Sequence, residues 1–210
     1  MTALRREIVE TARRMNALGI NQGRSGNVSA RDGAGFLITP SGLAYEAMNP
    51  GDIVAMALDG AVVGQGKPSN EWPIHQAIYA DRPEAGAVVH AHAPHATSLA
   101  CLGREIPAFH YMVAVAGGDS IPCAGYATPG SQALSDAVVV ALEGRRACLM
   151  ANHGLVAYGS DLAAAIDLAM EVETLAGQYW RALQIGKPKL LSKARMAEVH
   201  KLFETYGKPG

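Results

Sequence analysis

Two histidines separated by a single alanine end an apolar run, and a third histidine lies further along the chain. His90 and His92 close the run AVVHAH at 87–92. Side chains two residues apart on a strand point to the same face, roughly 7 Å apart. That separation suits two imidazoles that hold one divalent ion such as zinc, with N–metal distances of about 2.0–2.1 Å. His153, in the turn-like segment ANHG at 151–154, is the candidate third ligand of a catalytic site.

Glu71 is the best candidate for acid–base chemistry. It stands in the segment PSNE at 68–71, where a helix is expected to begin. An acidic residue at a helix start ordinarily stabilises the helix dipole by about 0.3–1 kcal/mol. Beside a metal ion, the same carboxylate could act as a general base instead. Both interpretations remain open for the sequence alone.

Three short polar segments could bind a phosphate group. Hydroxyls, amides and backbone N–H groups at turns and helix starts bind phosphate without requiring a cation. The same residue types are common at turns and caps, so each segment alone is a weak signal. The sequence contains no Walker or dinucleotide-binding fingerprint. The candidate phosphate-binding residues are Asn27, Ser41, Gly42, Ser69 and Asn70.

The four remaining histidines have less specific contexts. His75 follows Glu71 by one helical turn, so a surface contact or a contact with a site residue is expected rather than ligation. His95 is expected at a helix start, and His110 in a loop that could be near the site. His200 is expected to be solvated on the last helix.

Tyr111 and three cysteines complete the set of reactive side chains. Tyr111, in the segment FHYM, could supply an acidic hydroxyl or could simply pack as an amphipathic aromatic. Cys101, Cys123 and Cys148 are widely spaced in apolar contexts, without a CxxC pair. They are expected to be buried, reduced thiols of a cytoplasmic protein.

Composition narrows the class of protein. The chain has 210 residues, of which 49% are hydrophobic, and a formal net charge of −1. These values indicate one compact domain over 1–210 with a sizeable core. Without a basic surplus, nucleic acid and anionic membranes are not expected partners. No apolar stretch approaches the roughly 20 residues of a membrane span, and the N-terminal segment does not resemble a signal peptide.

The elements that must position these side chains alternate between helices and short strands. Several strands are joined by tight turns, so a purely parallel sheet is not expected. The pattern predicts an α/β fold in which helices cover a sheet. Helices are predicted at 3–18, from 69–70 to about 80, and at 94–102, 131–143, 161–184 and 192 to about 206; strands are predicted at 27–30, 35–39, 53–58, 61–63, 86–92, 147–151 and 155–157, with 107–129 irregular.

Taken together, short segments along nearly the whole chain resemble the class II aldolase/adducin family, and within it the branch that cleaves L-fuculose 1-phosphate. The segments are GNVS (26–29), LITPSG (37–42), PSNEW (68–72), VVHAH (88–92), IPAFHYM (106–112), AGG (116–118), IPC (121–123), YAT (126–128) and NHGL (152–155).

The resemblance implies a three-layer fold with a mostly antiparallel central sheet, and a homotetramer with its sites at subunit interfaces. It implies one zinc ion held by His90, His92 and His153. It implies that Glu71 moves a proton at the carbon beside the ketone of dihydroxyacetone phosphate. Tyr111 would reach in from a neighbouring subunit. The same resemblance places the five candidate phosphate-binding residues around the phosphate of a sugar substrate.

Two positions depart from the family pattern, and they keep alternatives open. Asn70 replaces a serine, and Pro129 replaces an aromatic residue that would line the aldehyde pocket. The substrate could therefore be 5-deoxyribulose or 5-methylthioribulose 1-phosphate instead of L-fuculose 1-phosphate. A metal-dependent decarboxylase of sugar-acid phosphates is a second class, and a non-catalytic adducin-like module a third. The resemblance also matches Tyr206 to a mobile family tyrosine, and a frayed terminal helix is the alternative.

Overall fold

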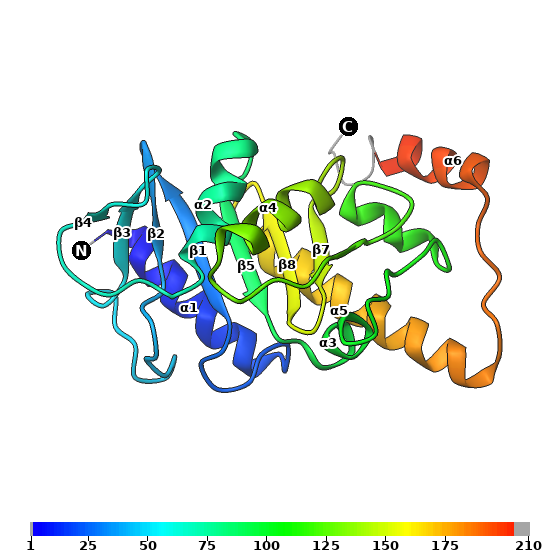
Figure 1. Ribbon diagram of the computed structural model, residues 1–210, viewed down its shortest axis with the longest axis horizontal. Coiled ribbons are helices and arrows are strands. Elements are labelled where there is room, and N and C mark those ends of the chain that lie inside the picture. Colours follow the sequence, from blue (N-terminus) through cyan, green and yellow to red (C-terminus); the bar gives the residue numbers. More distant parts are fainter. Residues whose placement is uncertain (1, 204–210) are drawn as a thin grey trace.

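The computed structural model describes residues 2–203, which form an eight-stranded mixed sheet with helices on both faces (Figure 1). The strand order is β4-β3-β2-β1-β5-β8-β7-β6. The helices are α1 (Ala3–Ala17), α2 (Trp72–Asp81), α3 (Pro94–Ala100), the 3-10 helix η1 (Tyr111–Ala116), α4 (Gln132–Ala141), α5 (Leu162–Ile185) and α6 (Lys193–Phe203). The strands are β1 (Asn27–Asp32), β2 (Gly35–Ile38), β3 (Val54–Ala57), β4 (Val62–Val63), β5 (Ala87–Ala91), β6 (Cys123–Ala124), β7 (Ala147–Met150) and β8 (Gly154–Gly159).

The sheet is mostly antiparallel, as predicted. Every strand pair is antiparallel except β6 with β7. Apolar residues of α1, α3 and α5 pack on one face, and those of α2 and α4 pack on the other. The two separate clusters make three layers, which confirms the predicted fold class.

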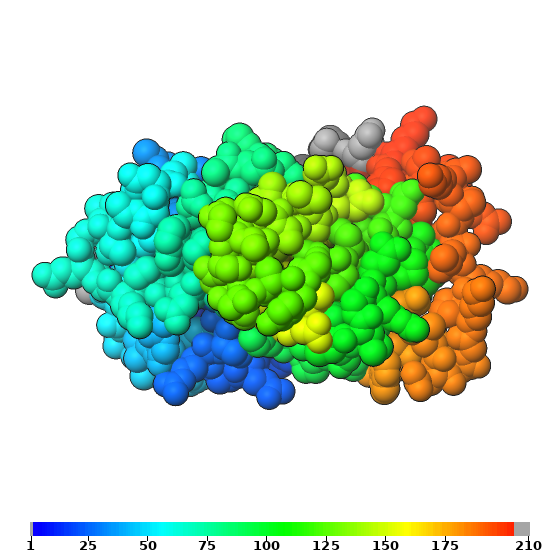
Figure 2. Space-filling view, in the orientation of Figure 1, coloured from blue at the N-terminus to red at the C-terminus, as the bar shows by residue number. Residues whose placement is uncertain are grey.

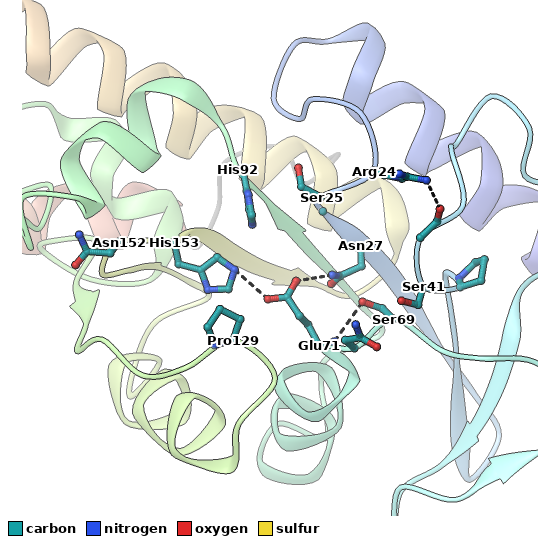
Figure 3. A pocket seen from close by; sticks show the side chains of 14 residues that line it. Arg24, Ser25, Asn27, Ser41, Ser69, Glu71, His92, Pro129, Asn152 and His153 are labelled. Carbon is teal, nitrogen blue, oxygen red and sulfur yellow. Dashed lines mark hydrogen bonds and ion pairs between the residues drawn. The ribbon is translucent and has the colours of Figure 1, made fainter.

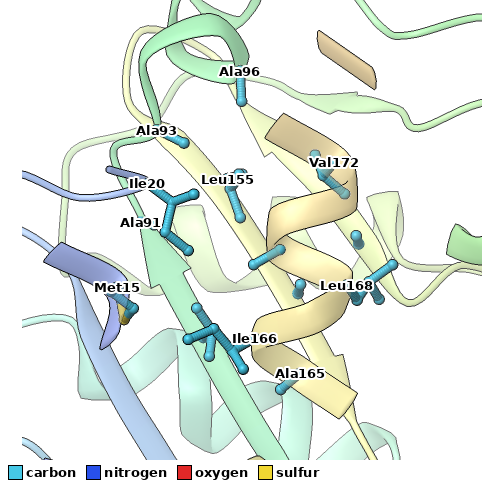
Figure 4. Packing of buried hydrophobic residues seen from close by; sticks show 14 of the residues in the cluster. Met15, Ile20, Ala91, Ala93, Ala96, Leu155, Ala165, Ile166, Leu168 and Val172 are labelled. Carbon is cyan, nitrogen blue, oxygen red and sulfur yellow. The ribbon is translucent and has the colours of Figure 1, made fainter. Parts of the chain in front are cut away.

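The long helix α5 covers the centre of the sheet. Ile166 and Val172 of α5 pack against β5 and β8, which contribute Ala91 and Leu155 to the same cluster (Figure 4). On the opposite face α2 and α4 lie side by side; in the space-filling view the teal segment with α2 meets the yellow-green segment with α4 (Figure 2). The central strands are thus buried on both faces, which explains why β5 reads as a continuous apolar run.

His90, a candidate metal ligand, lies on β5, between the two layers of helices. Val89 belongs to the cluster under α5, whereas Val88 belongs to the cluster under α2. Because side chains alternate along a strand, His90 points to the same face as Val88, toward α2. In the register between β1 and β5, the Cα atom of Asn27 is paired with that of His90. The polar start of β1 therefore lies beside the metal-ligand candidates.

The segment predicted as irregular contains two short elements, η1 and β6. The His110 ring accepts a hydrogen bond from the Met112 N–H at the start of η1, and Gly117 ends η1 with a left-handed φ of 101°. β6 pairs with β7 over only two residues, Cys123 and Ala124. Elements this short carry no periodicity that a sequence pattern could reveal.

The three cysteines differ in their exposure. Cys148 is buried as predicted, but Cys123 is only partly buried and Cys101 is exposed, so the prediction of buried thiols is wrong at Cys101. Cys101 follows the end of α3, where the chain turns at the surface.

Two further expectations concern Tyr206 and membrane spans. Tyr206 lies outside the described residues. Within the part of the chain that is described, no helix is both long and apolar enough to cross a membrane.

Candidate active site

His90, His92 and His153 come together at the end of β5. The ring centroids are 5.0 Å apart for His90 and His92, 4.8 Å for His90 and His153, and 4.9 Å for His92 and His153. With Glu71 they form a cluster in which one ligand atom from each residue lies within 4.8 Å of all the others. The structure therefore brings together all four residues that the sequence singled out for metal and acid–base chemistry.

The turn between β7 and β8 delivers the third histidine. Asn152 has a φ of 55°, in the left-handed region that asparagine tolerates better than most residues. At Gly154, an added Cβ would lie 2.5 Å from the Ala91 carbonyl oxygen and 3.1 Å from Cδ2 of His92. The glycine lets this turn pack directly against the end of β5, and this close packing places His153 beside the other two rings.

Glu71 points into the histidine cluster and not toward the helix that it precedes (Figure 3). Its Oε1 lies 2.9 Å from Nε2 of His153, and its Oε2 lies 3.1 Å from Nε2 of His90. Asn27 Nδ2 donates a 2.9 Å hydrogen bond to the same Oε2 atom. The side chain makes no capping hydrogen bond to α2, so the alternative of simple helix stabilisation does not describe its position.

The electrostatics of the cluster favour an ionised Glu71 and a neutral His92, whereas, against the effect of burial, the neighbouring Glu71 raises the pKa of His90. Burial alone would raise the pKa of Glu71, but the neighbouring His90 and His153 outweigh it and hold that pKa well below its ordinary value. Burial, together with the neighbouring His90 and His153, lowers the pKa of His92 to about 4. The ring of His92 is therefore neutral near pH 7 and keeps a lone pair for a cation.

This donor set fits a divalent metal ion. Three imidazoles with the fourth position left open are a ligand set of catalytic zinc sites, and the Glu71 carboxylate lies beside them. His90 Nδ1 donates to the Leu155 carbonyl oxygen at 2.8 Å, which directs Nε2 into the cluster. Nε2 of His92 lies 3.2 Å from Nε2 of His90, so both nitrogens face the same point. A backbone carbonyl that orients a ligand histidine in this way is a regular feature of metal sites.

A cavity of about 510 Å³ opens next to the cluster. Its wall includes Glu71, His92 and His153 together with polar loops from other elements. The candidate phosphate-binding residues Asn27, Ser41, Gly42, Ser69 and Asn70 all line it. One cavity thus combines the metal-ligand candidates with the three polar segments, although these are far apart in the sequence.

The loop before β1 lies unusually close to β5. A Cβ added at Gly26 would lie 2.6 Å from the His90 carbonyl oxygen and 2.7 Å from Oδ1 of Asn21. Only a residue without a side chain fits there, because both neighbours lie closer than a real Cβ approaches other atoms. Gly26 therefore allows the polar loop to reach the wall of the cavity.

The structure adds lining residues that the sequence argument missed. Arg24 is the only lysine or arginine among the described residues that line the cavity, and its Nη1 donates a 2.7 Å hydrogen bond to the Gly42 carbonyl oxygen (Figure 3). The position of a cationic residue in the Gly-rich loop 21–26 could have marked Arg24 as a candidate binding residue from the sequence. Pro129 and Asn152 also line the cavity.

The remaining candidates lie elsewhere or play different parts. Tyr111 begins η1, is 49% exposed and does not line the cavity. His110 is also absent from that lining. His95 lies at the start of α3 and pairs with Glu173 at 2.7 Å, whereas Nε2 of His200 lies 3.1 Å from Asp119.

His75 is fully buried, so the prediction of a surface contact is wrong, while the alternative contact with a site residue is confirmed. Its Nε2 lies against Oδ1 of Asn27, and Asn27 in turn holds Glu71. The face of α2 that carries His75 packs against β1, which helical spacing alone does not reveal.

Comparison with known proteins places the chain in a family. The sequence profile of the class II aldolase and adducin N-terminal domain matches residues 6–180. A 5-methylthioribulose-1-phosphate/5-deoxyribulose-1-phosphate aldolase of Rhodospirillum rubrum is 54% identical over 205 residues, 98% of this chain and 93% of that protein. The L-fuculose phosphate aldolase of Escherichia coli K12 is 48% identical, over 97% of this chain and 95% of its own length.

A solved structure agrees with these relatives. An L-fuculose 1-phosphate aldolase superposes with a TM-score of 0.94 at 37% sequence identity, covering 97% of each chain. The profile match spans most of the chain, and the fold and the clustered histidines are consistent with it. The chain therefore belongs to the class II aldolase and adducin family.

Proposed function

We propose that this protein is a zinc-dependent aldolase that cleaves a ketose 1-phosphate to dihydroxyacetone phosphate and an aldehyde. The observation that carries the proposal is the joint placement of His90, His92, His153 and Glu71 on the wall of a cavity with phosphate-type donors. An adducin-like module without catalysis has no need for such a cluster. The relatives named as aldolases of this substrate class support the same reaction.

Each residue has a defined part in this reaction. His90, His92 and His153 would hold the metal ion, which supplies Lewis-acid stabilisation of negative charge on the substrate oxygens. In the cleavage direction the C3–C4 bond breaks and the C4 hydroxyl loses its proton as the aldehyde forms. The dihydroxyacetone phosphate half gains a proton at the carbon beside its ketone; Glu71, ionised in the free protein, is proposed to take up one proton, the equivalent of the one that the C4 hydroxyl loses, and to deliver it to that carbon. In the reverse direction, Glu71 removes that proton.

The phosphate end of the substrate is proposed to bind in the polar part of the cavity. Ser41, Gly42, Ser69 and Asn70 line that part, and Asn27 joins it to Glu71. Hydroxyl, amide and backbone N–H donors in loops suit a phosphate group. A phosphorylated sugar is therefore the proposed ligand.

The aldehyde end decides which ketose 1-phosphate is cleaved. Pro129 presents an apolar ring to the cavity in place of an aromatic residue. All three candidate substrates, L-fuculose 1-phosphate and the 5-deoxy and 5-methylthio ribulose 1-phosphates, share the dihydroxyacetone phosphate half.

The proposal includes a homotetramer. In it the half-exposed Tyr111 of one subunit handles the C4 hydroxyl proton of the substrate bound to a neighbouring subunit. The cytoplasmic location expected from the sequence stays a prediction.

We expect the purified, zinc-loaded protein to release dihydroxyacetone phosphate from at least one of these three substrates. The measurement is a coupled assay of dihydroxyacetone phosphate, run with each ketose 1-phosphate and with its unphosphorylated ketose as the control. The ratio of kcat/KM among the three substrates identifies the aldehyde preference. Carbon dioxide release from 3-keto sugar-acid phosphates without any dihydroxyacetone phosphate would contradict the aldolase proposal and favour a decarboxylase.

Arg24 is proposed to provide the cationic contact to the phosphate. Its guanidinium reaches the Gly42 loop, where one of its five donors is used by the Gly42 carbonyl. We expect Arg24→Met to raise KM about tenfold with little change in kcat, because a charge-assisted hydrogen bond contributes about 1.5–3 kcal/mol.

The matched control for this variant is Arg104→Met, which removes an exposed arginine outside the cavity. Steady-state kinetics at two salt concentrations provide the measurement. An unchanged KM in Arg24→Met, or an equal rise in the control, would remove Arg24 from the phosphate site.

A further inference from the structure

A line of buried polar side chains leads from Glu71 into the layer between β1 and α2. Beyond the Asn27–Glu71 hydrogen bond, Oδ1 of Asn27 contacts Nε2 of His75 at 2.5 Å. Nδ1 of His75 lies 2.6 Å from Oγ of Ser29, and that hydroxyl lies 2.8 Å from the hydroxyl of Tyr79. Asn27, Ser29, His75 and Tyr79 are each no more than 2% exposed, so these groups depend on one another for hydrogen bonds.

The Glu71 carboxylate at one end of this line fixes which group donates and which accepts in each hydrogen bond. An ionised Glu71 can only accept, so Asn27 must turn its NH₂ group to Glu71 and its oxygen to His75. Nε2 of His75 must then carry the ring proton. A neutral ring with its proton on Nε2 accepts at Nδ1, so Ser29 donates its hydroxyl proton there and accepts from Tyr79 in turn.

The burial of His75 and Tyr79 keeps this hydrogen-bonded line in one protonation state. Burial, with a further contribution from His90, lowers the pKa of His75 to about 3, so the ring is neutral near pH 7. Burial raises the pKa of Tyr79 above its ordinary value, so its hydroxyl keeps the proton that it donates. The line therefore has one consistent set of donors and acceptors.

We infer that His75, held as the Nε2–H tautomer by Ser29 and Tyr79, is a positioning residue that orients the Asn27 amide and, through it, the carboxylate of Glu71. With the opposite tautomer, His75 would direct a lone pair at the oxygen of Asn27. The amide would then rotate and turn its oxygen toward the carboxylate, which would lose a donor and face a repelling dipole. This inference rests on the proposed acid–base role of Glu71.

A purely structural explanation accounts less well for these residues. Burying an imidazole, two hydroxyls and an amide costs free energy that an apolar residue of similar volume would avoid. The polar line also ends at a residue on the cavity wall, because both Asn27 and Glu71 line the cavity. A network whose only part is to fill the layer has no reason to reach that wall.

The test uses variants that touch neither the cavity nor the metal ligands. We expect Ser29→Ala in the zinc-loaded protein to lower kcat about tenfold, as removal of a partner behind a catalytic group commonly does, while KM changes less than about twofold. Tyr79→Phe, one bond further away, should have a smaller effect in the same direction. Ser135→Ala is the matched control, because Ser135 is also fully buried but bonds only to its own helix region.

A spectroscopic readout separates positioning from loss of stability. In protein labelled with ¹⁵N-histidine, the nitrogen shifts and long-range couplings of His75 report which ring nitrogen carries the proton. We expect Nε2–H in the parent protein and in Ser135→Ala, and a population of Nδ1–H in Ser29→Ala. Metal content measured on the same samples should be equal in all three.

Two results would overturn the inference. One is a His75 proton on Nδ1 in the parent protein. The other is a Ser29→Ala variant that matches Ser135→Ala in kcat and in tautomer. Either result, in a parent protein that releases dihydroxyacetone phosphate, leaves the proposed aldolase function standing; a parent protein that cleaves no ketose 1-phosphate removes the proposed function, whatever the tautomer.

Discussion

Glu71→Gln should abolish proton transfer at the dihydroxyacetone phosphate carbon while the protein still binds its metal. The variant keeps the size of the side chain and the hydrogen-bonding contact with Asn27, but it has no carboxylate to take or give a proton. General acid–base groups contribute about 10²–10⁴-fold, so a fall of that size in kcat is expected. The measurement is deuterium exchange from solvent into dihydroxyacetone phosphate, followed by NMR.

Exchange tests Glu71 more directly than overall turnover does. It needs no aldehyde, so it does not depend on which ketose 1-phosphate is the preferred substrate. Glu143→Gln is the matched control, since Glu143 is exposed beyond the end of α4. Unchanged exchange in Glu71→Gln, with metal content equal to that of the parent, would take the acid–base role away from this residue.

Removal of the metal should have an equally large effect. We expect chelator-treated protein to lose aldol cleavage by about 10³-fold, because the ion supplies several kcal/mol of charge stabilisation that no side chain in the cavity replaces. Addition of zinc should restore the activity. His153→Ala should prevent that restoration, because it removes one of three nitrogens from the cluster.

Metal content by mass spectrometry, together with the aldolase assay, provides the measurement. About one zinc per chain is expected in the parent protein, and much less in His153→Ala. His200→Ala is the matched control, since His200 pairs with Asp119 away from the cluster. Cleavage that is indifferent to chelators would refute a metal-dependent reaction.

The sequence predicted which residues come together in the Glu/His cluster, because local pattern and chemistry agreed there. An apolar run that ends in His90 and His92 requires a strand end, and the turn around His153 is marked by Asn152 and Gly154. The helix and strand boundaries of the central elements follow from the same strong periodicity. The pattern alone left His153 as a candidate third ligand, and the family resemblance singled it out, because sequence spacing alone does not bring distant turns together.

The sequence could not predict features that depend on how distant elements pack. The burial of His75 depends on how α2 sits on β1, and the reach of Arg24 depends on where the Gly42 loop folds back. The orientation of Glu71 was open for the same reason. Helical spacing shows on which side of a helix a residue lies. It does not show which other element packs against that side.

The pairing of β1 with β5 has a consequence for the range of substrates. Asn27 and His90 are opposite each other in the ladder, and Gly26 rests against the His90 backbone. The distance between the start of β1, with Asn27, and His90 is therefore set by main-chain pairing and not by flexible side chains. If the proposed function holds, this fixed distance suits the dihydroxyacetone phosphate half, which all candidate substrates share. Substitutions at residues such as Pro129 could then change which aldehyde half is accepted without altering that distance.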